Sequence, residues 1–243
     1  ITTDKCYENR ETKRPYREND PMGGYDPYSC SKGCDELIIS SYRRSFFNDP
    51  AANVWIASAR AGNVIGGGDW AKDRIIPDAT RAFLSGEALV LRNPDSIRPY
   101  QHVFEPVFMY LDIACEQWED PEKQGWYNVG PDLCDCVTTG ELAGKFAAYV
   151  GDDEKKCEDE KKCGDGKLCG LQSGKKAEGP HEAGLLMLDN SRVKEVFGWR
   201  PVWHIDEAVK ACAGYAAACR KSPEKANEVL KKQLEKYITE GYL

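Results

Sequence analysis

The 243-residue chain alternates short apolar segments with amphipathic helical patterns, and this alternation is the feature that most constrains its fold. Residues 1–3 have the character of a strand end, a helical pattern starts at Pro27, and residues 54–59 predict a buried strand. Further helices are predicted at 76–84, 104–118, 138–151, 191–197, 205–215 and 223–243. Strands separated by helices pair in parallel, and the helices cover the sheet. The sequence therefore predicts an α/β fold built on a parallel sheet.

Three of the predicted helices carry local signals. Thr138 and Glu141 have the spacing of a capping box at a helix start. Gly86 follows the pattern at 76–84 and predicts its end, because glycine readily adopts the backbone conformation that terminates a helix. The helix from Pro27 carries one stripe at helical spacing, formed by Cys34, Leu37, Ile38, Ser41 and Ser45.

Tyr28 and Lys32 lie four residues apart near the start of that helix, so their side chains share one face. A lysine beside a tyrosine favours the phenolate and makes the tyrosine a base nearer to neutral pH. Such a base serves the oxidation of an alcohol, a reaction that also needs a hydride acceptor. Without further context, a pair at this spacing is more often only a partly exposed helix turn.

Polar residues directly after the first strand supply that context. Thr3, Asp4 and Lys5 follow the strand end at residues 1–3. Open α/β sheets place their binding sites at the carboxyl ends of the strands, so these residues are candidates for a site that includes Tyr28. The structural alternative is a salt bridge between Asp4 and Lys5 at the strand end.

Composition excludes several classes of function. Apolar residues make up 41% of the chain, enough for a sizeable core, and no apolar run approaches the ~20 residues of a membrane helix. The net charge of −7 argues against a nucleic-acid partner, because phosphate binding needs concentrated basic surface. No signal-peptide pattern is found at the N-terminus. We therefore expect a cytoplasmic protein that binds neither nucleic acid nor membrane.

Eleven cysteines are scattered along the chain. Cys157, Cys163 and Cys169 are spaced by six residues within the charged segment 151–179, whereas zinc ligands usually pair about two to four residues apart. A fourth ligand would have to come from elsewhere, such as Cys134 or Cys136. The segment instead predicts a solvated, flexible insertion without a metal. The odd number of cysteines favours reduced thiols.

Motifs spread over most of the chain carry a more specific resemblance. They are residues 3–7 (TDKCY), 21–28 (PMGGYDPY), 60–70 (RAGNVIGGGDW), 73–77 (DRIIP), 92–94 (RNP), 97–102 (IRPYQH), 126–130 (WYNVG), 180–183 (PHEA) and 198–201 (GWRP). Through them the chain resembles the extended short-chain dehydrogenase/reductases that act on nucleotide sugars, and within these the CDP-glucose 4,6-dehydratases. Only the segment at about 151–179 looks unlike the family.

The resemblance implies the C-terminal part of a Rossmann-type parallel sheet with a smaller α/β substrate-binding lobe. We expect 1–68 and 97–120 to form the nucleotide-binding domain, 69–96 and 121–222 the lobe, and 223–243 a helical tail. The family's glycine-rich cofactor turn, between a first strand and a helix, is not found here: residues 66–68 (GGG) follow Tyr28 and Lys32. We therefore expect a piece of a longer protein that alone is inactive, binds NAD poorly and exposes a sheet edge.

The resemblance also implies a reaction and its residues. NAD takes a hydride from C4 of the sugar while Tyr28, activated by Lys32, removes the hydroxyl proton. Thr3 hydrogen-bonds the sugar oxygen, Asp4 protonates the departing C6 hydroxyl, and Lys5 stands where thymidine-sugar dehydratases carry a glutamate base. Tyr28 and Lys32 also contact the cofactor. The hydride then returns to C6, so NAD is regenerated in each turnover.

Substrate-binding residues and a homodimer are implied in the same way. The resemblance assigns the diphosphate to two arginines, a phosphate oxygen to an asparagine, and the nucleotide or sugar pocket to three further residues. A surface salt bridge is the alternative for each arginine, and His102 is equally interpreted as a core residue. In that order, the candidates are Arg92 and Arg98, Asn63, and Arg74, His181 and Glu182.

Three hypotheses remain open. The first is a CDP-glucose 4,6-dehydratase, the second another nucleotide-sugar enzyme of the same fold, such as an epimerase or decarboxylase, and the third a non-catalytic module. The Asp4–Lys5 pair argues against the second, because an epimerase does not eliminate water. The joint presence of Thr3, Asp4, Lys5, Tyr28 and Lys32 argues against the third. The choice between NAD and NADP cannot be made from these residues.

Overall fold

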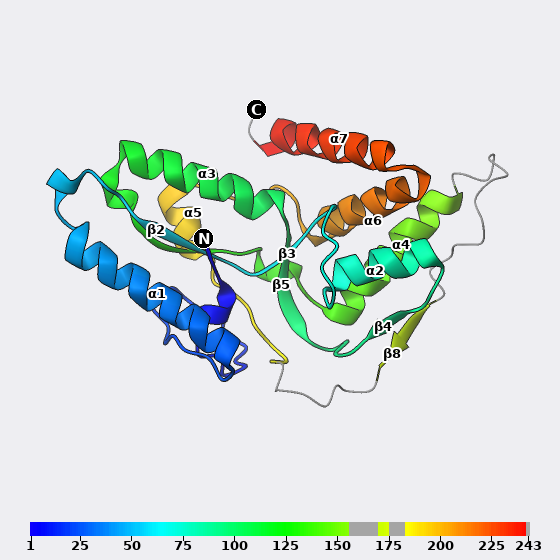
Figure 1. Ribbon diagram of the computed structural model, residues 1–243, viewed down its shortest axis with the longest axis horizontal. Helices are drawn as coiled ribbons and strands as arrows, with labels where there is room; N and C mark the ends of the chain where they lie inside the picture. Colours follow the sequence, from blue (N-terminus) through cyan, green and yellow to red (C-terminus); the bar gives the residue numbers. More distant parts are fainter. Residues whose placement is uncertain (156–169, 175–182, 242–243) are drawn as a thin grey trace.

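The computed structural model describes residues 1–155, 170–174 and 183–241 (Figure 1). Its helices are α1 (Pro27–Phe46), α2 (Ile75–Ser85), α3 (Phe104–Glu119), α4 (Thr139–Lys155), α5 (Ser191–Phe197), α6 (Ile205–Lys221) and α7 (Pro223–Gly241). Its strands are β1 (Thr2–Thr3), β2 (Ala57–Ala61), β3 (Asn63–Ile65), β4 (Leu89–Leu91), β5 (Ile97–His102), β6 (Gly125–Val129), β7 (Cys136–Thr138) and β8 (Leu171–Ser173). The short 3-10 helices are η1 (Asp4–Cys6), η2 (Pro50–Ala52), η3 (Pro121–Lys123) and η4 (Leu133–Asp135).

The first sheet contains three parallel strands in the order β1-β2-β6. Helix α1 connects β1 to β2, and α3 lies between β2 and β6 in the chain. Ser58 and Arg60 of β2 contact Glu36 of α1, whereas Ala59 between them packs in one core with Met109 of α3. Because successive side chains of a strand point to opposite faces, the two helices cover opposite faces of the sheet. Figure 1 shows β2 running between α1 and α3. Ala59, Met109, Tyr127, Val193 and Trp199 are among the residues that form the core of this part.

The second part is built on β3-β5-β7 and on the parallel pair β4-β8. Strands β3 and β5 are parallel, whereas β7 runs antiparallel to β5. The chain reverses direction through η4 after β6, which is why β7 departs from the predicted parallel pairing. Helices α2, α4 and α6 enclose a second core, which includes Ile76, Phe83, Leu142, Phe146 and Val209. The α/β class and the parallel sheet are therefore confirmed.

Most predicted elements are found, with changes at their ends. The capping box is present: the backbone N–H of Thr138 donates to Glu141 at 2.8 Å, and that of Glu141 donates to the Thr138 hydroxyl at 3.1 Å. Gly86 terminates α2 with a φ of 70°. The predicted strand at 54–59 starts later, at Ala57, because η2 and the left-handed Asn53 occupy the preceding turn. Helix α4 continues past Gly151 to Lys155.

The described strands are grouped differently from the predicted domains at more than one place. Strands β3 and β5, in the segments 1–68 and 97–120 assigned to the nucleotide-binding domain, belong to the second sheet. Strand β6, which lies within the segment 121–222 assigned to the lobe, is the third strand of the first sheet. Within the predicted insertion 151–179, β8 pairs with β4. Cys157, Cys163 and Cys169 lie outside the described residues, and the cysteines within them are free thiols. No described helix is both long and apolar enough to cross a membrane.

The apolar stripe on α1 faces outward rather than toward the sheet. Leu37 and Ile38 are 60% and 56% exposed, whereas the buried positions of the helix are Gly33 and Glu36. Helical spacing shows which side chains share a face, but it does not show what that face contacts. Here the helix meets the sheet through a glycine and a carboxylate.

Glu36 is buried because it pairs with Arg60 of β2. The Arg60 guanidinium donates to a Glu36 oxygen at 2.7 Å, and both side chains are 2% exposed. Burial alone would raise the pKa of Glu36, but the hydrogen bond and charge of Arg60 hold it below its usual value. Ser58 of β2 donates to the same carboxylate at 2.8 Å, and Thr2 of β1 also donates to it. The ion pair thus joins α1 to two strands.

The network continues across the sheet to β6. Arg60 also donates to the Tyr7 hydroxyl at 2.9 Å, and this hydroxyl donates to Asn128 at 2.6 Å. Asn128 in turn donates to the carbonyl oxygen of Tyr16 at 2.8 Å. A buried charge needs such satisfied partners, because an unpaired one is costly in a low-dielectric interior.

We predict that Glu36→Ala lowers the free energy of unfolding by about 3–5 kcal/mol, because it leaves the Arg60 guanidinium buried without its carboxylate. Chemical denaturation measures the change. The apolar double variant Glu36→Leu/Arg60→Met should recover much of the loss, since no charge then remains buried. Glu116→Ala, which removes a more exposed pair with Lys123, should cost less than about 1 kcal/mol. A small loss for Glu36→Ala would contradict the assignment.

His102 is a core residue, which was one of the two interpretations of this residue from the sequence. Its ring packs against Phe104 and Trp203, with ring centroids 4.5 and 4.9 Å away. Its Nδ1 accepts a hydrogen bond from the Phe104 backbone at 3.3 Å, and within the described part of the chain no partner for Nε2 is found. Burial lowers the pKa of His102 to about 3.

This depressed pKa makes the fold acid-sensitive. The unfolded chain binds a proton at His102 below about pH 6.5, whereas the folded chain does so only near pH 3, so stability falls as the pH drops through this window. We predict that His102→Gln flattens the decline between about pH 6.5 and 5, as measured by unfolding at several pH values. His204→Gln should change the slope in the opposite sense, because Asp135 raises the pKa of His204. Parallel curves for His102→Gln and the unchanged protein would contradict this prediction.

Candidate active site

The candidate site starts where β1 ends and the chain turns into η1. Thr3 caps this turn: its hydroxyl accepts a hydrogen bond from the Lys5 backbone at 3.3 Å and donates to Asp4 at 3.1 Å. Thr3 and Ala61 are paired neighbours on β1 and β2. The predicted trio Thr3, Asp4 and Lys5 therefore lies at the carboxyl end of a parallel strand, where sites of open α/β sheets form.

Helix α1 brings Tyr28 to the same place. Asp26 caps the helix by accepting from the Ser29 backbone at 3.0 Å, and Pro27 occupies the first turn. Gly33, one turn further on, permits close contact with the loop: a Cβ there would lie 3.0 Å from the Gly23 nitrogen and 3.3 Å from the Cys6 oxygen. Local capping and this close approach together place the helix start next to η1.

Lys32 lies beside Tyr28, but its ammonium donates its hydrogen bond to Asp35. The Lys32 ammonium is 5.8 Å from the centre of the Tyr28 ring, and it donates to Asp35 at 3.0 Å. The contact with Asp35 raises the pKa of Lys32, so the ammonium stays charged beside the phenol. Spacing on the helix predicted the neighbourhood of the pair but not this partner.

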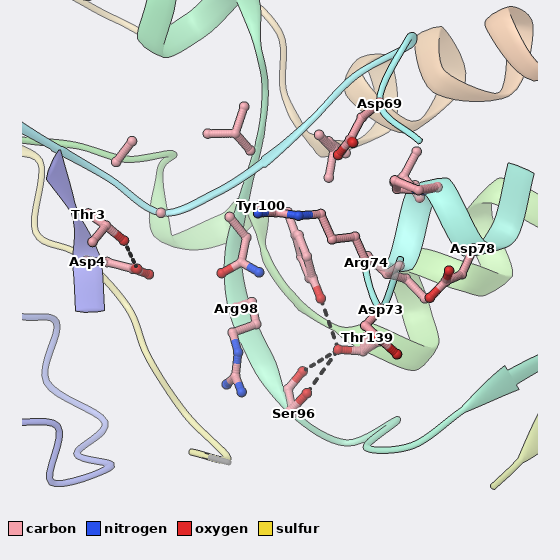
Figure 2. A pocket seen from close by; sticks show the side chains of 18 of the residues that line it. Thr3, Asp4, Asp69, Asp73, Arg74, Asp78, Ser96, Arg98, Tyr100 and Thr139 are labelled. Atoms are coloured by element: carbon pink, nitrogen blue, oxygen red, sulfur yellow. Dashed lines mark hydrogen bonds between the residues drawn. The ribbon is translucent and has the colours of Figure 1, made fainter. Parts of the chain in front are cut away.

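A pocket of about 630 Å³ brings most of the predicted residues together, and we call it the first pocket (Figure 2). Figure 2 shows Thr3 and Asp4 on one side, Arg74 and Asp69 on the other, and Arg98 between them. Lys32 does not line the first pocket, and His181 and Glu182 lie outside the described residues. The predicted residues among its lining are Thr3, Asp4, Lys5, Tyr28, Asn63, Arg74, Arg92 and Arg98.

Asp4 has the most unusual electrostatic environment of these residues. Its side chain is buried, and burial raises its pKa above the usual value, against the opposing effects of Lys5, Thr3 and Arg98. Its Oδ2 atom has no hydrogen-bond partner within the described ranges. A buried carboxyl group with a raised pKa keeps its proton to higher pH than an exposed one, which suits it to donate a proton.

The three predicted arginines differ in their contacts. Arg98 is buried and donates to the backbone oxygens of Ile97, at 3.0 Å, and of Ala183. Arg92 is exposed and forms an ion pair with Asp73 at 3.1 Å. Arg74 is an exposed residue directly before α2. Arg98 is thus held rigidly near Asp4, whereas Arg92 lies at the open part of the pocket.

Sequence reasoning missed a group of hydroxyls in the first pocket. The Thr139 hydroxyl lies 2.9 Å from that of Ser96 and 3.0 Å from that of Tyr100 (Figure 2). Tyr100 had a usable signal, because it is two residues from Arg98 on β5 and shares its face. Thr139 had none, since it comes 39 residues after Tyr100. Asp73, also in this pocket, has a left-handed φ of 63° that is unusual for a residue other than glycine.

A second pocket, of about 710 Å³, borders the same residues from another direction. It shares Asp4, Lys5 and Tyr28 with the first pocket, and Asn9 and Glu11 also line it. The three shared side chains therefore lie where two cavities meet.

Similarity to known proteins extends over most of the chain. The family model described as GDP-mannose 4,6 dehydratase matches residues 1–212. The chain belongs to this family. Its relatives include the CDP-glucose 4,6-dehydratase of Salmonella typhimurium, which is 46% identical over 215 residues, covering 86% of the chain and 55% of the relative. The chain thus spans about half the length of this relative of the family, and the resemblance seen in the motifs is confirmed.

Solved structures with a similar fold agree with this architecture. DesIV, a dTDP-glucose 4,6-dehydratase from Streptomyces venezuelae with NAD and TYD bound, superposes with a TM-score of 0.69 at 18% identity, covering 92% of this chain and 61% of that chain. The UDP-glucose 4-epimerase of Thermotoga maritima with UDP-glucose gives 0.67 at 18% identity, covering 96% and 62%. The Rossmann-type fold is therefore confirmed, and it is shared by dehydratases and epimerases.

We predict that Asp4→Asn stabilises the folded chain at pH 7. The raised pKa of Asp4 means that the ionised carboxylate is disfavoured in the folded state at neutral pH, and a neutral amide removes this penalty. Thermal unfolding measures the increase in Tm. The matched control is Asp20→Asn, where Arg14 lowers the carboxyl pKa, so the same substitution should decrease Tm. A decrease for both variants would contradict the environment described for Asp4.

Proposed function

We propose that the full-length protein is a CDP-glucose 4,6-dehydratase, a hydro-lyase that forms CDP-4-keto-6-deoxyglucose for deoxysugar and surface polysaccharide biosynthesis. The observation that carries the proposal is the meeting of Asp4, Lys5 and Tyr28 at one pocket wall, with Asp4 buried at a raised pKa. The choice of substrate is supported by the 46% identical relative, a CDP-glucose 4,6-dehydratase. We further propose that the protein is cytoplasmic.

Tyr28 is the proposed base for oxidation at C4. The C5 proton of a hexose is not acidic, and a ketone at C4 makes it so. Tyr28 is exposed to both pockets at the first turn of α1, where it can take the proton of the C4 hydroxyl. Lys32, whose ammonium lies 5.8 Å from the centre of the ring, is the proposed activating residue. Thr3 hydrogen-bonds the sugar oxygen and thereby orients it.

Asp4 and Lys5 carry out the elimination in this proposal. Asp4, whose pKa is raised by burial, donates a proton to the C6 hydroxyl as water leaves. Lys5, the next residue in η1, takes the C5 proton and must be neutral to do so. One group gives a proton and its neighbour removes one, so the pair supplies both transfers that loss of water requires.

NAD is the proposed cofactor, and Tyr28 and Lys32 would hold it. The residues fit such a group, because the exposed phenol of Tyr28 at the start of α1 lines a pocket together with Thr3 at the carboxyl end of β1. When bound, NAD supplies the hydride acceptor for C4 and the donor for C6.

The nucleotide sugar is the proposed ligand of the first pocket. Arg92 and Arg98 are proposed for the diphosphate, because a guanidinium can bind phosphate through two parallel hydrogen bonds. The hydrogen bonds of Arg98 to the carbonyl oxygens of Ile97 and Ala183 hold its guanidinium in place. Asn63 is proposed for a phosphate oxygen, and Arg74, His181 and Glu182 for the nucleotide or sugar.

An epimerase is the second candidate, because the UDP-glucose 4-epimerase of Thermotoga maritima has a similar fold. Epimerisation needs the oxidation step at C4 but not the loss of water. The Asp4–Lys5 pair would then have no task in the reaction. The product formed by a Lys5 variant therefore discriminates between the two candidates.

We predict that Tyr28→Phe abolishes turnover of CDP-glucose in the full-length protein and leaves its fold intact. Chromatography with mass spectrometry detects the product as the substrate minus one water, and circular dichroism checks folding. Tyr42→Phe, on the same helix outside both pockets, should retain full activity. Undiminished turnover by Tyr28→Phe would overturn the mechanism. A Lys5→Ala variant that epimerises a sugar nucleotide would favour the second candidate.

A homodimer is the proposed assembly, with α1 of each copy facing the other. Helix α1 covers one face of the first sheet and leaves apolar side chains exposed, which a solvated monomer surface rarely concentrates. A second copy offers the same apolar face and is self-complementary about a twofold axis. The exposed residues are Leu37, Ile38, Tyr42 and Phe46.

We predict that Leu37→Glu shifts the full-length protein from dimer to monomer, because two carboxylates would be buried in the interface. Sedimentation velocity measures the change. Leu133→Glu alters a similarly exposed leucine on η4 and should leave the dimer intact. A dimer that persists in Leu37→Glu would place the interface elsewhere.

A further inference from the structure

A cluster of three side chains outside both pockets combines a thiol, a carboxylate and an imidazole. Cys134 and Asp135 belong to η4, and His204 directly precedes α6. One possible ligand atom from each lies within 4.8 Å of the other two. None of the three residues lines the first or second pocket. The proposed dehydratase reaction therefore gives this cluster no task.

Asp135 is oriented by the start of α6. Its Oδ1 accepts a hydrogen bond from the Ile205 backbone at 3.0 Å. This leaves Oδ2, which lies 2.8 Å from Nδ1 of His204 and 3.9 Å from the Cys134 sulfur. Donor atoms around a tetrahedral zinc ion lie roughly 3.3–3.7 Å apart, given bonds of about 2.0–2.3 Å. The two observed distances bracket this range.

The cluster is closed toward the protein and open toward solvent. Asp135 is 4% exposed, whereas Cys134 and His204 are exposed. A cation can therefore enter from solvent, and small rotations of the two exposed side chains can adjust their donor atoms. In metal sites, a ligand side chain is commonly oriented by a hydrogen bond from a group behind it. Here the backbone N–H of Ile205 orients Asp135 in this way.

The surrounding charges favour a cation. Asp135 raises the pKa of His204 by accepting its hydrogen bond, and Asp132 and Glu207 raise it further. Burial and the same two aspartates raise the pKa of Cys134. One positive charge opposes them: Lys194 forms an ion pair with Asp132. The carboxylates of Asp132, Asp135 and Glu207 therefore make the surroundings of the cluster negative.

We propose that Cys134, Asp135 and His204 form a binding site for a divalent transition metal of the zinc class. Mixed sulfur, nitrogen and oxygen donors select such borderline ions over magnesium or calcium. On binding, the Cys134 thiol loses its proton to solvent, His204 binds as neutral imidazole, and water completes the coordination. The metal would tie η4, after β6, to the start of α6. This goes beyond the sequence expectation of no metal.

The competing interpretation is a helix cap without a metal. Asp135 caps α6 in either case, and a protonated His204 would then simply pair with the free carboxylate oxygen. A cap needs the carboxylate but not the thiol. The dependence of metal binding on Cys134 therefore separates the two interpretations.

The test uses Co²⁺, whose thiolate complexes absorb through a sulfur-to-metal charge-transfer band. The full chain, with Cys157, Cys163 and Cys169 replaced by serine and freed of metal by a chelator, is titrated with Co²⁺ and then Zn²⁺. We expect one equivalent of Co²⁺ with a thiolate band that Zn²⁺ abolishes. Cys134→Ser should remove the band, and His204→Gln should weaken Co²⁺ binding at least tenfold. Cys115→Ser, an exposed cysteine of α3, should change neither.

Either of two results would overturn the proposal: no thiolate band in the serine background, or a band that survives Cys134→Ser. Circular dichroism without metal checks that each variant folds. Should Cys134→Ser fail to fold, Cys134→His keeps a metal ligand and should bind Co²⁺ without the thiolate band. Zn²⁺ should also raise the Tm of the serine background and leave that of Cys134→Ser unchanged.

Discussion

The buried ion pair between Glu36 and Arg60 is the interaction on which the position of the candidate site depends. It fixes α1 against β2, and through Thr2 and Asn128 its network reaches the strands on either side. A charged pair tolerates little displacement, because each lost hydrogen bond leaves a buried charge exposed to a low-dielectric interior. The helix that carries Tyr28 is therefore held in register with the strand that leads to Asp4.

Around this fixed frame, the site itself is built from groups that are unfavourable for stability. Asp4 is buried with one oxygen unpaired, and Asp73 has a left-handed backbone. Both are features that a stably folded chain would otherwise avoid. The unpaired buried carboxyl becomes intelligible if a proton has to be released at Asp4. Stability is supplied instead by the two apolar cores and by the network around Arg60.

Local rules allowed much of this to be predicted from sequence. The capping box at Thr138 and the end of α2 at Gly86 depend on neighbouring residues, and the meeting of Asp4 with Tyr28 follows from the edge rule for parallel sheets. What could not be predicted depends on partners far along the chain. Arg60 is a lone charge in an apolar strand, and nothing near it in sequence identifies Glu36 as its partner.

The outward direction of the apolar stripe of α1 could not be predicted from sequence either, and it affects how Tyr28 is supported. A helix that buries a glycine and a carboxylate toward the sheet, and exposes leucine and isoleucine on its other side, is amphipathic in the reverse of the usual sense. Burial of that stripe by a second copy would add the apolar contact that the sheet side lacks. Helix α1 would then be held by charge on one side and by the hydrophobic effect on the other, and Tyr28 at its start would gain a more rigid support.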